Sequence, residues 1–177
     1  LLGRSRDAKV REEIAAALDL PAPPGADALP PLPELLRMKG NAGRGKAAFV
    51  KGSCATCHQV AGEGLNYGPD LCEIGSKLPP EALYEAILYP SNAVAHGYAG
   101  VQLETQDGEL LVGFLSSETD EQLTLRMAGG LERELAVGKV KARKELPESL
   151  MPVGLAGLLT PQELADLVAY LAGLTKK

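Results

Sequence analysis

Apolar residues recur at helical spacing near both ends of the chain. Val10, Ile14 and Leu18 share one helix face, and Ser5 can cap that helix, so a helix is predicted over residues 5–18. Residues 34–50 are predicted to be helical in two pieces, which Gly40-Asn41 separates. A proline-rich segment at 21–33 lies between these helices and is typical of an extended linker or arm.

Two more helices are predicted further along. One runs from Pro79-Pro80 to a stop at Pro90, and the glycine-rich stretch 62–75 before it is predicted as loop. The other follows Thr160-Pro161, where an N-cap residue, an N1 proline and Glu163 make a capping-box pattern. The helical pattern therefore returns only at the end of the chain.

Between these helices the period changes to alternation. Val101, Leu103 and Thr105 share one face, and an Asp107-Gly108 turn leads to a second apolar run at 110–115. Three more short strands are predicted at 123–127, 131–137 and 140–143. About five strands are enough for a small antiparallel sheet or barrel.

The periodicities predict an α+β protein in which a β segment interrupts the helices. The expected blocks are an N-terminal helix and linker or arm at 1–39, a helical part at 40–92, a β insertion at 93–146 and a second helical part at 147–177. With 177 residues, the chain has room for one domain or two small ones. Because it opens at Leu1 without a methionine, we expect it to be an excerpt or a processed product.

Composition narrows the possible partners. Eighteen basic against 23 acidic side chains give a net charge of −5, which argues against nucleic acid. No apolar run is long enough to predict a membrane span. The chain has five Tyr, two Phe and no Trp, so a buried prosthetic group could fill part of the core.

Residues 54–58 carry the clearest chemical signal. Cys54, Cys57 and His58 form C-x-x-C-H, the attachment signal of a c-type haem. Two thiols on one helical turn can add to the two vinyl groups of a porphyrin, and the next residue offers an imidazole to the iron. The sequence therefore predicts one covalent haem with His58 as a ligand.

Two other uses of these cysteines compete with haem. A thioredoxin-like redox pair needs a βαβ context, whereas the residues before Cys54 have the pattern of helix and loop. Zinc could be held by three cysteines and one histidine if Cys72 joined the motif. Adjacent side chains such as Cys57 and His58 are awkward donors to one tetrahedral ion, so haem is the favoured hypothesis.

A second axial ligand is sought among three methionines and His96. Met151 lies in an irregular segment before Pro152, where stiff backbone presents the thioether; Met38 precedes the haem segment and Met127 lies in a predicted strand. A Met ligand opposite His raises the reduction potential of the iron, and Met151 is our candidate. His96 would give a bis-His haem of lower potential, although its position at the entry to the sheet favours a surface role.

Residues 68–72 are expected near the haem as well. A ligating imidazole usually donates its other N–H to an oxygen, and the Pro69 carbonyl is the candidate acceptor. Leu71 is then expected to pack on the haem face. Gly68-Pro69-Asp70 would also make an ordinary turn. Cys72 is left over as an odd thiol, and burial is its favoured role.

These residues together resemble a class I cytochrome c. Gly45 and Phe49, the C-x-x-C-H motif, Gly68-Pro69-x-Leu71, Met151-Pro152 and Leu167-x-x-Tyr170 follow that family's order. The resemblance covers about residues 40–90 and 147–174, and implies that the first and last helices cross. The β insertion departs from it and is similar to the haem-binding C-x-x-C-H domain family of planctomycete and verrucomicrobial bacteria. That family implies a class I cytochrome c fold split by a small antiparallel β-sheet or barrel.

The resulting hypothesis is a monohaem c-type cytochrome domain that transfers single electrons and is not an enzyme. With both axial positions filled by protein, no site remains for a substrate. Covalent attachment implies a periplasmic or other extracytoplasmic location, and the expected partner is a redox protein or a dehydrogenase fused upstream. Two alternatives are a small-ligand sensor or peroxidase-like site with a labile Met151, and a β insertion that serves as an interaction module. A basic run ending at Lys144 (Lys139, Lys141, Arg143, Lys144) is a docking face or a solvated strand.

Overall fold

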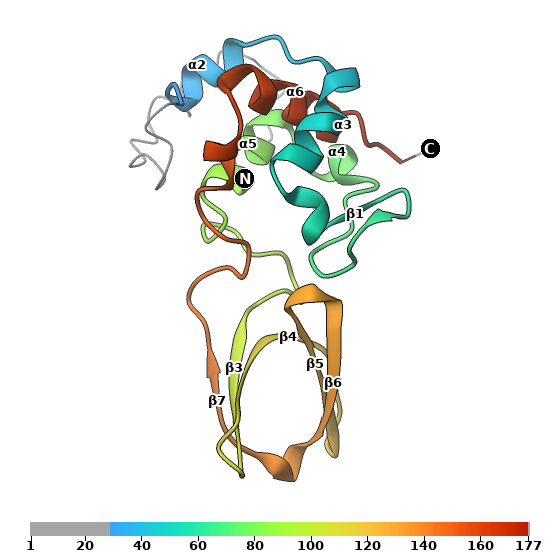
Figure 1. Ribbon diagram of the computed structural model, residues 1–177, viewed down its shortest axis with the longest axis vertical. Coiled ribbons are helices and arrows are strands. Elements are labelled where there is room, and N and C mark those ends of the chain that lie inside the picture. Colours follow the sequence, from blue (N-terminus) through green and yellow to red (C-terminus); the bar gives the residue numbers. More distant parts are fainter. Residues whose placement is uncertain (1–28, 177) are drawn as a thin grey trace. The chain divides into compact units, whose positions relative to one another are not determined.

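The computed structural model describes residues 29–176, and these form two compact units (Figure 1). The first comprises the described residues up to Cys54 together with 71–89 and 153–176. The second comprises 55–70 and 90–152. The helix predicted at 5–18 and the linker residues 21–28 lie outside the described part of the chain.

The first unit is helical. Its main helices are α2 (Leu32–Arg37), α3 (Ala42–Lys51), α4 (Ile74–Lys77), α5 (Pro80–Leu88) and α6 (Pro161–Ala172). The break between α2 and α3 falls at 38–41, as predicted, and α6 begins with the predicted capping box at Thr160. The linker prediction was wrong at its end, because Pro33 lies inside the first turn of α2, where a missing N–H costs nothing. The loop prediction over 62–75 was wrong at two places, because a short strand at Glu63–Gly64 and the start of α4 both lie within it.

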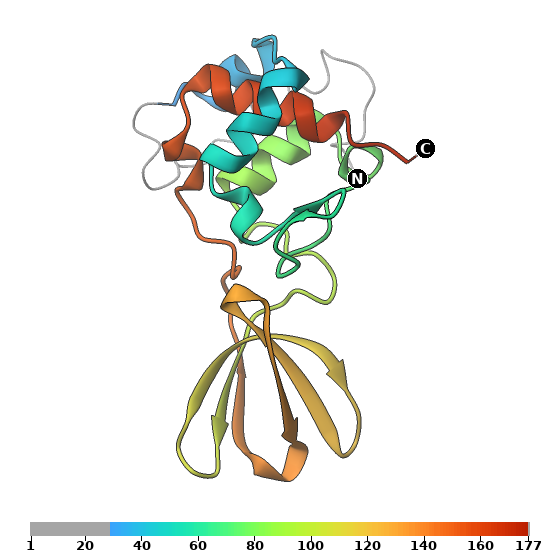
Figure 2. The ribbon, with the colours of Figure 1, turned by 45° about the vertical axis from the view of Figure 1, so that its right-hand side comes forward.

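The helices α3 and α6 cross each other (Figure 2). The residue of α3 at the crossing is Gly45. A Cβ on Gly45 would lie 2.1 Å from the Asp166 carbonyl oxygen and 2.3 Å from the Tyr170 Cβ, so the two backbones meet there without a side chain between them. One turn further on, the rings of Phe49 and Tyr170 pack edge to face at 6.1 Å. The crossing of these two helices, which the family resemblance implies, is therefore present.

A buried carboxylate also links the same two helices. Asp166 is 3% exposed and accepts hydrogen bonds from the Asn41 amide at 2.7 Å, from Arg44 Nε at 2.6 Å and from Gln162 Nε2 at 2.9 Å. The hydrogen bond from Arg44 is the main cause that lowers the pKa of Asp166 from 3.8 to about 2. Asp166 therefore stabilises the fold as an anion.

The substitution Asp166→Asn is expected to destabilise the protein at pH 7 by about 2 kcal/mol, because charged hydrogen bonds to Asn41 and Arg44 are lost. The folded pKa lies below the unfolded value, so this contribution is fully present above pH 3.8 and is lost as the pH falls through about 2. Urea unfolding of both proteins at several pH values measures the difference. This role would be contradicted if the difference in free energy of unfolding between the two proteins did not decrease in acid.

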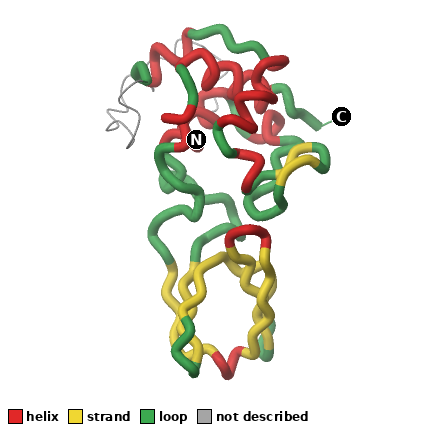
Figure 3. The backbone as a smooth tube through the Cα atoms, in the orientation of Figure 1, coloured by secondary structure: helices red, strands yellow, loops and turns green. Residues whose placement is uncertain are grey.

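The second unit contains a short hairpin and a sheet. The hairpin pairs β1 (Gln59–Val60) with β2 (Glu63–Gly64). The sheet consists of five strands in the order β6-β5-β4-β3-β7, and every neighbouring pair is antiparallel. Its strands are β3 (Val101–Thr105), β4 (Leu110–Glu118), β5 (Gln122–Met127), β6 (Leu131–Ala136) and β7 (Val140–Glu145). Figure 3 shows the helical turns that join β5 to β6 and β6 to β7.

The predicted α+β class and the antiparallel sheet are confirmed, whereas a closed barrel is wrong. Within the described residues, pairing ends at β6 on one side and β7 on the other, and no ladder joins these two strands. The alternating face of the sheet has its own core, made of Val101, Leu103, Leu111, Leu123 and Leu125. The hairpin glycine Gly108 has φ of 87°, as an Asp-Gly turn requires.

Candidate functional site

The C-x-x-C-H segment begins where α3 ends. Gly52 caps the helix, Ser53 adopts a left-handed φ of 61°, and a 3-10 turn follows at Cys54–Thr56. Cys54, Cys57 and His58 are half-buried, and neither cysteine forms a disulfide. The motif therefore holds two reduced thiols on a tight turn followed at once by an imidazole.

The imidazole of His58 has a defined tautomer. Its Nδ1 lies 2.8 Å from the carbonyl oxygen of Pro69, which can only accept a hydrogen bond. Nδ1 therefore carries the proton, and the lone pair of Nε2 remains for a cation. Burial lowers the pKa of His58 from 6.5, while the bond to Pro69 opposes this shift. The ring is consequently neutral at pH 7, the form in which histidine binds metals.

Residues 64–69 wrap closely around this histidine. The amides of Leu65, Tyr67 and Gly68 donate to the carbonyls of Ala55 and Cys57 at 3.0, 3.0 and 2.6 Å. A Cβ on Gly68 would lie 2.7 Å from Cε1 of the His58 ring, so only glycine fits against that face. The loop thus fixes both the backbone before His58 and the plane of its ring.

Met151 lies in a loop that two serines brace. Its amide donates to Ser149 Oγ at 3.1 Å, and the Ser149 amide donates to Ser91 Oγ at 3.0 Å. The Met151 side chain is half-buried. Its ligation stays a prediction, as does the packing of the half-buried Leu71 on a haem face.

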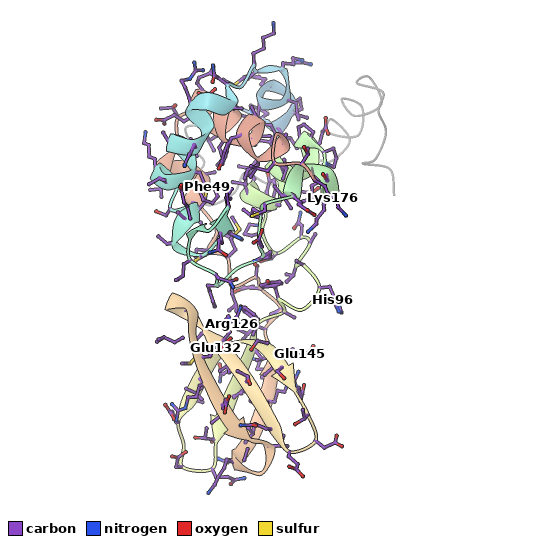
Figure 4. The ribbon with its side chains drawn as sticks, turned by 90° about the vertical axis from the view of Figure 1, so that its right-hand side faces the viewer. Phe49, His96, Arg126, Glu132, Glu145 and Lys176 are labelled. Atoms are coloured by element: carbon purple, nitrogen blue, oxygen red, sulfur yellow. The ribbon has the colours of Figure 1, made fainter. Side chains whose placement is uncertain are left out.

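The other candidate ligands lie in the sheet or at the surface. Met127 packs against the core of the sheet, and His96 is exposed in the segment before β3 (Figure 4). Cys72 is half-buried and forms no disulfide. Within residues 29–176, no three His, Cys, Asp or Glu side chains form a group that could hold a metal ion.

Sequence reasoning missed one residue of this site. Tyr67 is 8% exposed, and its ring lies 5.5 Å from that of Phe114 on β4. The only signal for it was its place directly before Gly68-Pro69. Its partner is 47 residues away in the sequence, so no local pattern could reveal the contact.

The comparisons with known proteins agree with this chemistry. The family model described as cytochrome c matches residues 42–124. The match runs from the start of α3 into β5, so it includes Cys54, Cys57, His58 and Pro69, whereas Met151 lies beyond it. No curated protein matches the chain. Over residues 42–124, the chain is thus similar to the cytochrome c family.

None of the described helices is long and apolar enough to cross a membrane.

Proposed function

We propose that this chain is a monohaem c-type cytochrome domain in which His58 and Met151 are the axial ligands of the iron. The observation that carries the proposal is the contact of His58 Nδ1 with the Pro69 carbonyl, directly after a C-x-x-C turn and within the matched residues. This contact leaves Nε2 free to bind iron and holds the ring in one plane.

The donor set fits a covalent haem. Cys54 and Cys57 offer thiols for two thioether bonds, and His58 offers a neutral imidazole. When bound, haem supplies an iron centre that gains and loses one electron. The protein supplies the anchors, the orientation of the ligand ring and a partly desolvated surrounding. Such an arrangement suits electron transfer and needs no substrate site.

Met151 is proposed as the second ligand because its loop is braced and its thioether is half-buried. The hydrogen bond from its amide to Ser149 Oγ holds the backbone at this residue. A thioether ligand stabilises reduced iron and raises the reduction potential. With His58 and Met151 both bound, the iron would have no open position for a small molecule, which is why we propose electron transfer rather than small-molecule chemistry.

The compartment and partners follow from the cofactor. Thioether attachment of haem takes place outside the cytoplasm, so we propose a periplasmic or equivalent location. The partner would be a redox protein or a dehydrogenase module on the same polypeptide. The basic run on β7 is a weak candidate for docking, because Lys141 pairs with Glu104 and Arg143 pairs with Glu118.

Expression alongside a c-type maturation system tests the proposal. We expect the intact mass to exceed the polypeptide by one haem, and the pyridine haemochrome spectrum to show two saturated vinyl groups. The oxidised protein should show the long-wavelength band of Met-to-iron ligation near neutral pH. A colourless product with the bare polypeptide mass would overturn the proposal, and immediate CO binding to the reduced protein would favour a sensor with a labile Met151.

The substitution Met151→Leu is expected to abolish the long-wavelength band and lower the reduction potential, because leucine fills similar volume without a donor atom. Met127→Leu and Met38→Leu are the matched controls, and both should retain the band. Absorbance and redox titration measure the effects. Loss of the band in a control with its retention in Met151→Leu would reassign the ligand.

A further inference from the structure

Three aromatic rings join the loop beside His58 to the β-sheet. The ring centres of Tyr67 and Phe114 are 5.5 Å apart. Phe114 also contacts Tyr98, with 4.8 Å between the two ring centres. Phe114 belongs to β4 and is 4% exposed, so its ring is fixed by the sheet. Offset and tilted pairs at these separations are favourable beyond the area that they bury.

Further contacts hold this junction. The Arg126 guanidinium on β5 lies 6.0 Å from the Phe114 ring centre, and it pairs with Glu132 on β6 (Figure 4). The Leu65 side chain lies beside Gly130, where a Cβ would be 3.4 Å from Leu65 Cδ1. The β insertion therefore contacts the loop at two places: Phe114 on β4 meets Tyr67, and Gly130, in the turn between β5 and β6, meets Leu65.

The residues next to Tyr67 in this loop contact the histidine directly. The amides of Tyr67 and Gly68 both donate to the Cys57 carbonyl, at the residue before His58. Gly68 lies against the face of the imidazole, and Pro69 accepts its Nδ1 proton. A displacement of the Tyr67 ring would thus move the two groups that set the plane and the hydrogen bond of His58.

From this geometry we infer that Phe114 is a positioning residue for His58, acting through Tyr67 and the Gly68-Pro69 backbone. The inference rests on the proposed function, in which His58 binds iron. The β insertion then contributes no ligand, but it fixes the orientation and hydrogen bonding of one. Because such outer contacts tune the basicity of a ligating histidine, the sheet contributes to the reduction potential of the haem.

The first test requires no haem signal. In the full chain, Phe114→Leu removes the ring but keeps an apolar side chain, and we expect the Tyr67 and Gly68 amides to exchange with solvent roughly three- to tenfold faster. Leu111→Val is the matched control, because Leu111 belongs to the separate core of the same sheet. The control should leave these two amides at the wild-type rate.

The second test uses the haem-loaded protein. Phe114→Leu should shift the reduction potential and alter the EPR signature of the axial ligand plane, whereas Phe114→Tyr, which restores a ring, should recover both. Tyr98→Leu removes the outer ring at a half-buried position, so it should give a smaller change in the same direction. If Phe114→Leu does not fold, Tyr98→Leu can be measured in its place.

The outcomes separate the two proposals. The positioning role would be overturned if Phe114→Leu and Tyr98→Leu both left the amide exchange rates and the reduction potential unchanged. It would also be overturned if Leu111→Val accelerated exchange at Tyr67 and Gly68 as much as Phe114→Leu, because that would indicate a general loss of stability. A wild-type protein without haem would overturn the proposed function instead. In that case, faster exchange at Tyr67 and Gly68 would still support the link between sheet and loop.

Discussion

Gly45→Ala is expected to lower the free energy of unfolding by about 3 kcal/mol, because the new methyl group meets backbone that cannot give way. The Cβ would lie 2.1 Å from the carbonyl oxygen of Asp166 and 2.3 Å from the Tyr170 Cβ. To relieve this overlap, α3 and α6 must separate, and the packing of Phe49 on Tyr170 is then lost. Urea unfolding followed by circular dichroism measures the effect.

Gly43→Ala is the matched control on the same helix. A Cβ at Gly43 would meet only the side-chain oxygen of Asn41, at 3.1 Å, and the position is exposed. Because alanine is the better helix former, this variant should be neutral or slightly more stable than the wild type. Equal destabilisation by both substitutions would show that helix crossing is not what requires Gly45.

Gly68→Ala is expected to give the largest effect at the site. The added methyl would lie 2.7 Å from Cε1 and 2.9 Å from Nδ1 of the His58 ring, so the ring must turn away and the contact with Pro69 is broken. Loss of such an orienting partner typically weakens metal ligation about 10- to 100-fold. We expect a low haem-loaded fraction and a shifted reduction potential, measured by haem absorbance per chain and by redox titration.

The comparison variant for this substitution is Gly138→Ala. Gly138 lies in the turn between β6 and β7, and a Cβ there would meet no atom within 4 Å. Haem loading of Gly138→Ala should equal that of the wild type. If Gly68→Ala loads haem as fully and keeps the same potential, the glycine at this position does not serve the histidine.

Local sequence patterns predicted most of the elements. Alternation at Val101, Leu103 and Thr105 produced β3, and the capping box at Thr160 marked the first turn of α6. These signals are reliable because each depends on residues within one element. The short helix α4 was missed because four residues give too little periodicity to detect.

Contacts between distant residues could not be predicted in this way. Nothing near Asp166 in the sequence indicates that it accepts bonds from Asn41 and Arg44, which lie more than 120 residues earlier. The sheet was predicted without a decision between open and closed forms, because closure depends on the pairing of β6 with β7 and not on either strand alone.

At the site, the motif identified Cys54, Cys57 and His58, but not what holds them. The contact of His58 with Pro69 could be anticipated because it lies only 11 residues along the chain and follows the usual need of a ligating imidazole. The support of that loop by Phe114 depends on how the insertion folds back, which the spacing of the motif does not contain.

The two outer strands also affect how copies of this protein meet. Lys141, Arg143 and Lys144 of β7 are exposed. A second copy of β7 could pair with this edge in an antiparallel register centred between Ala142 and Arg143. Each Lys141 would then lie opposite a Lys144. Like charges facing each other across strands are unfavourable, so the open edge discourages growth of the sheet from one molecule to the next. In this register, the charges of β7 therefore oppose edge-to-edge pairing of two copies.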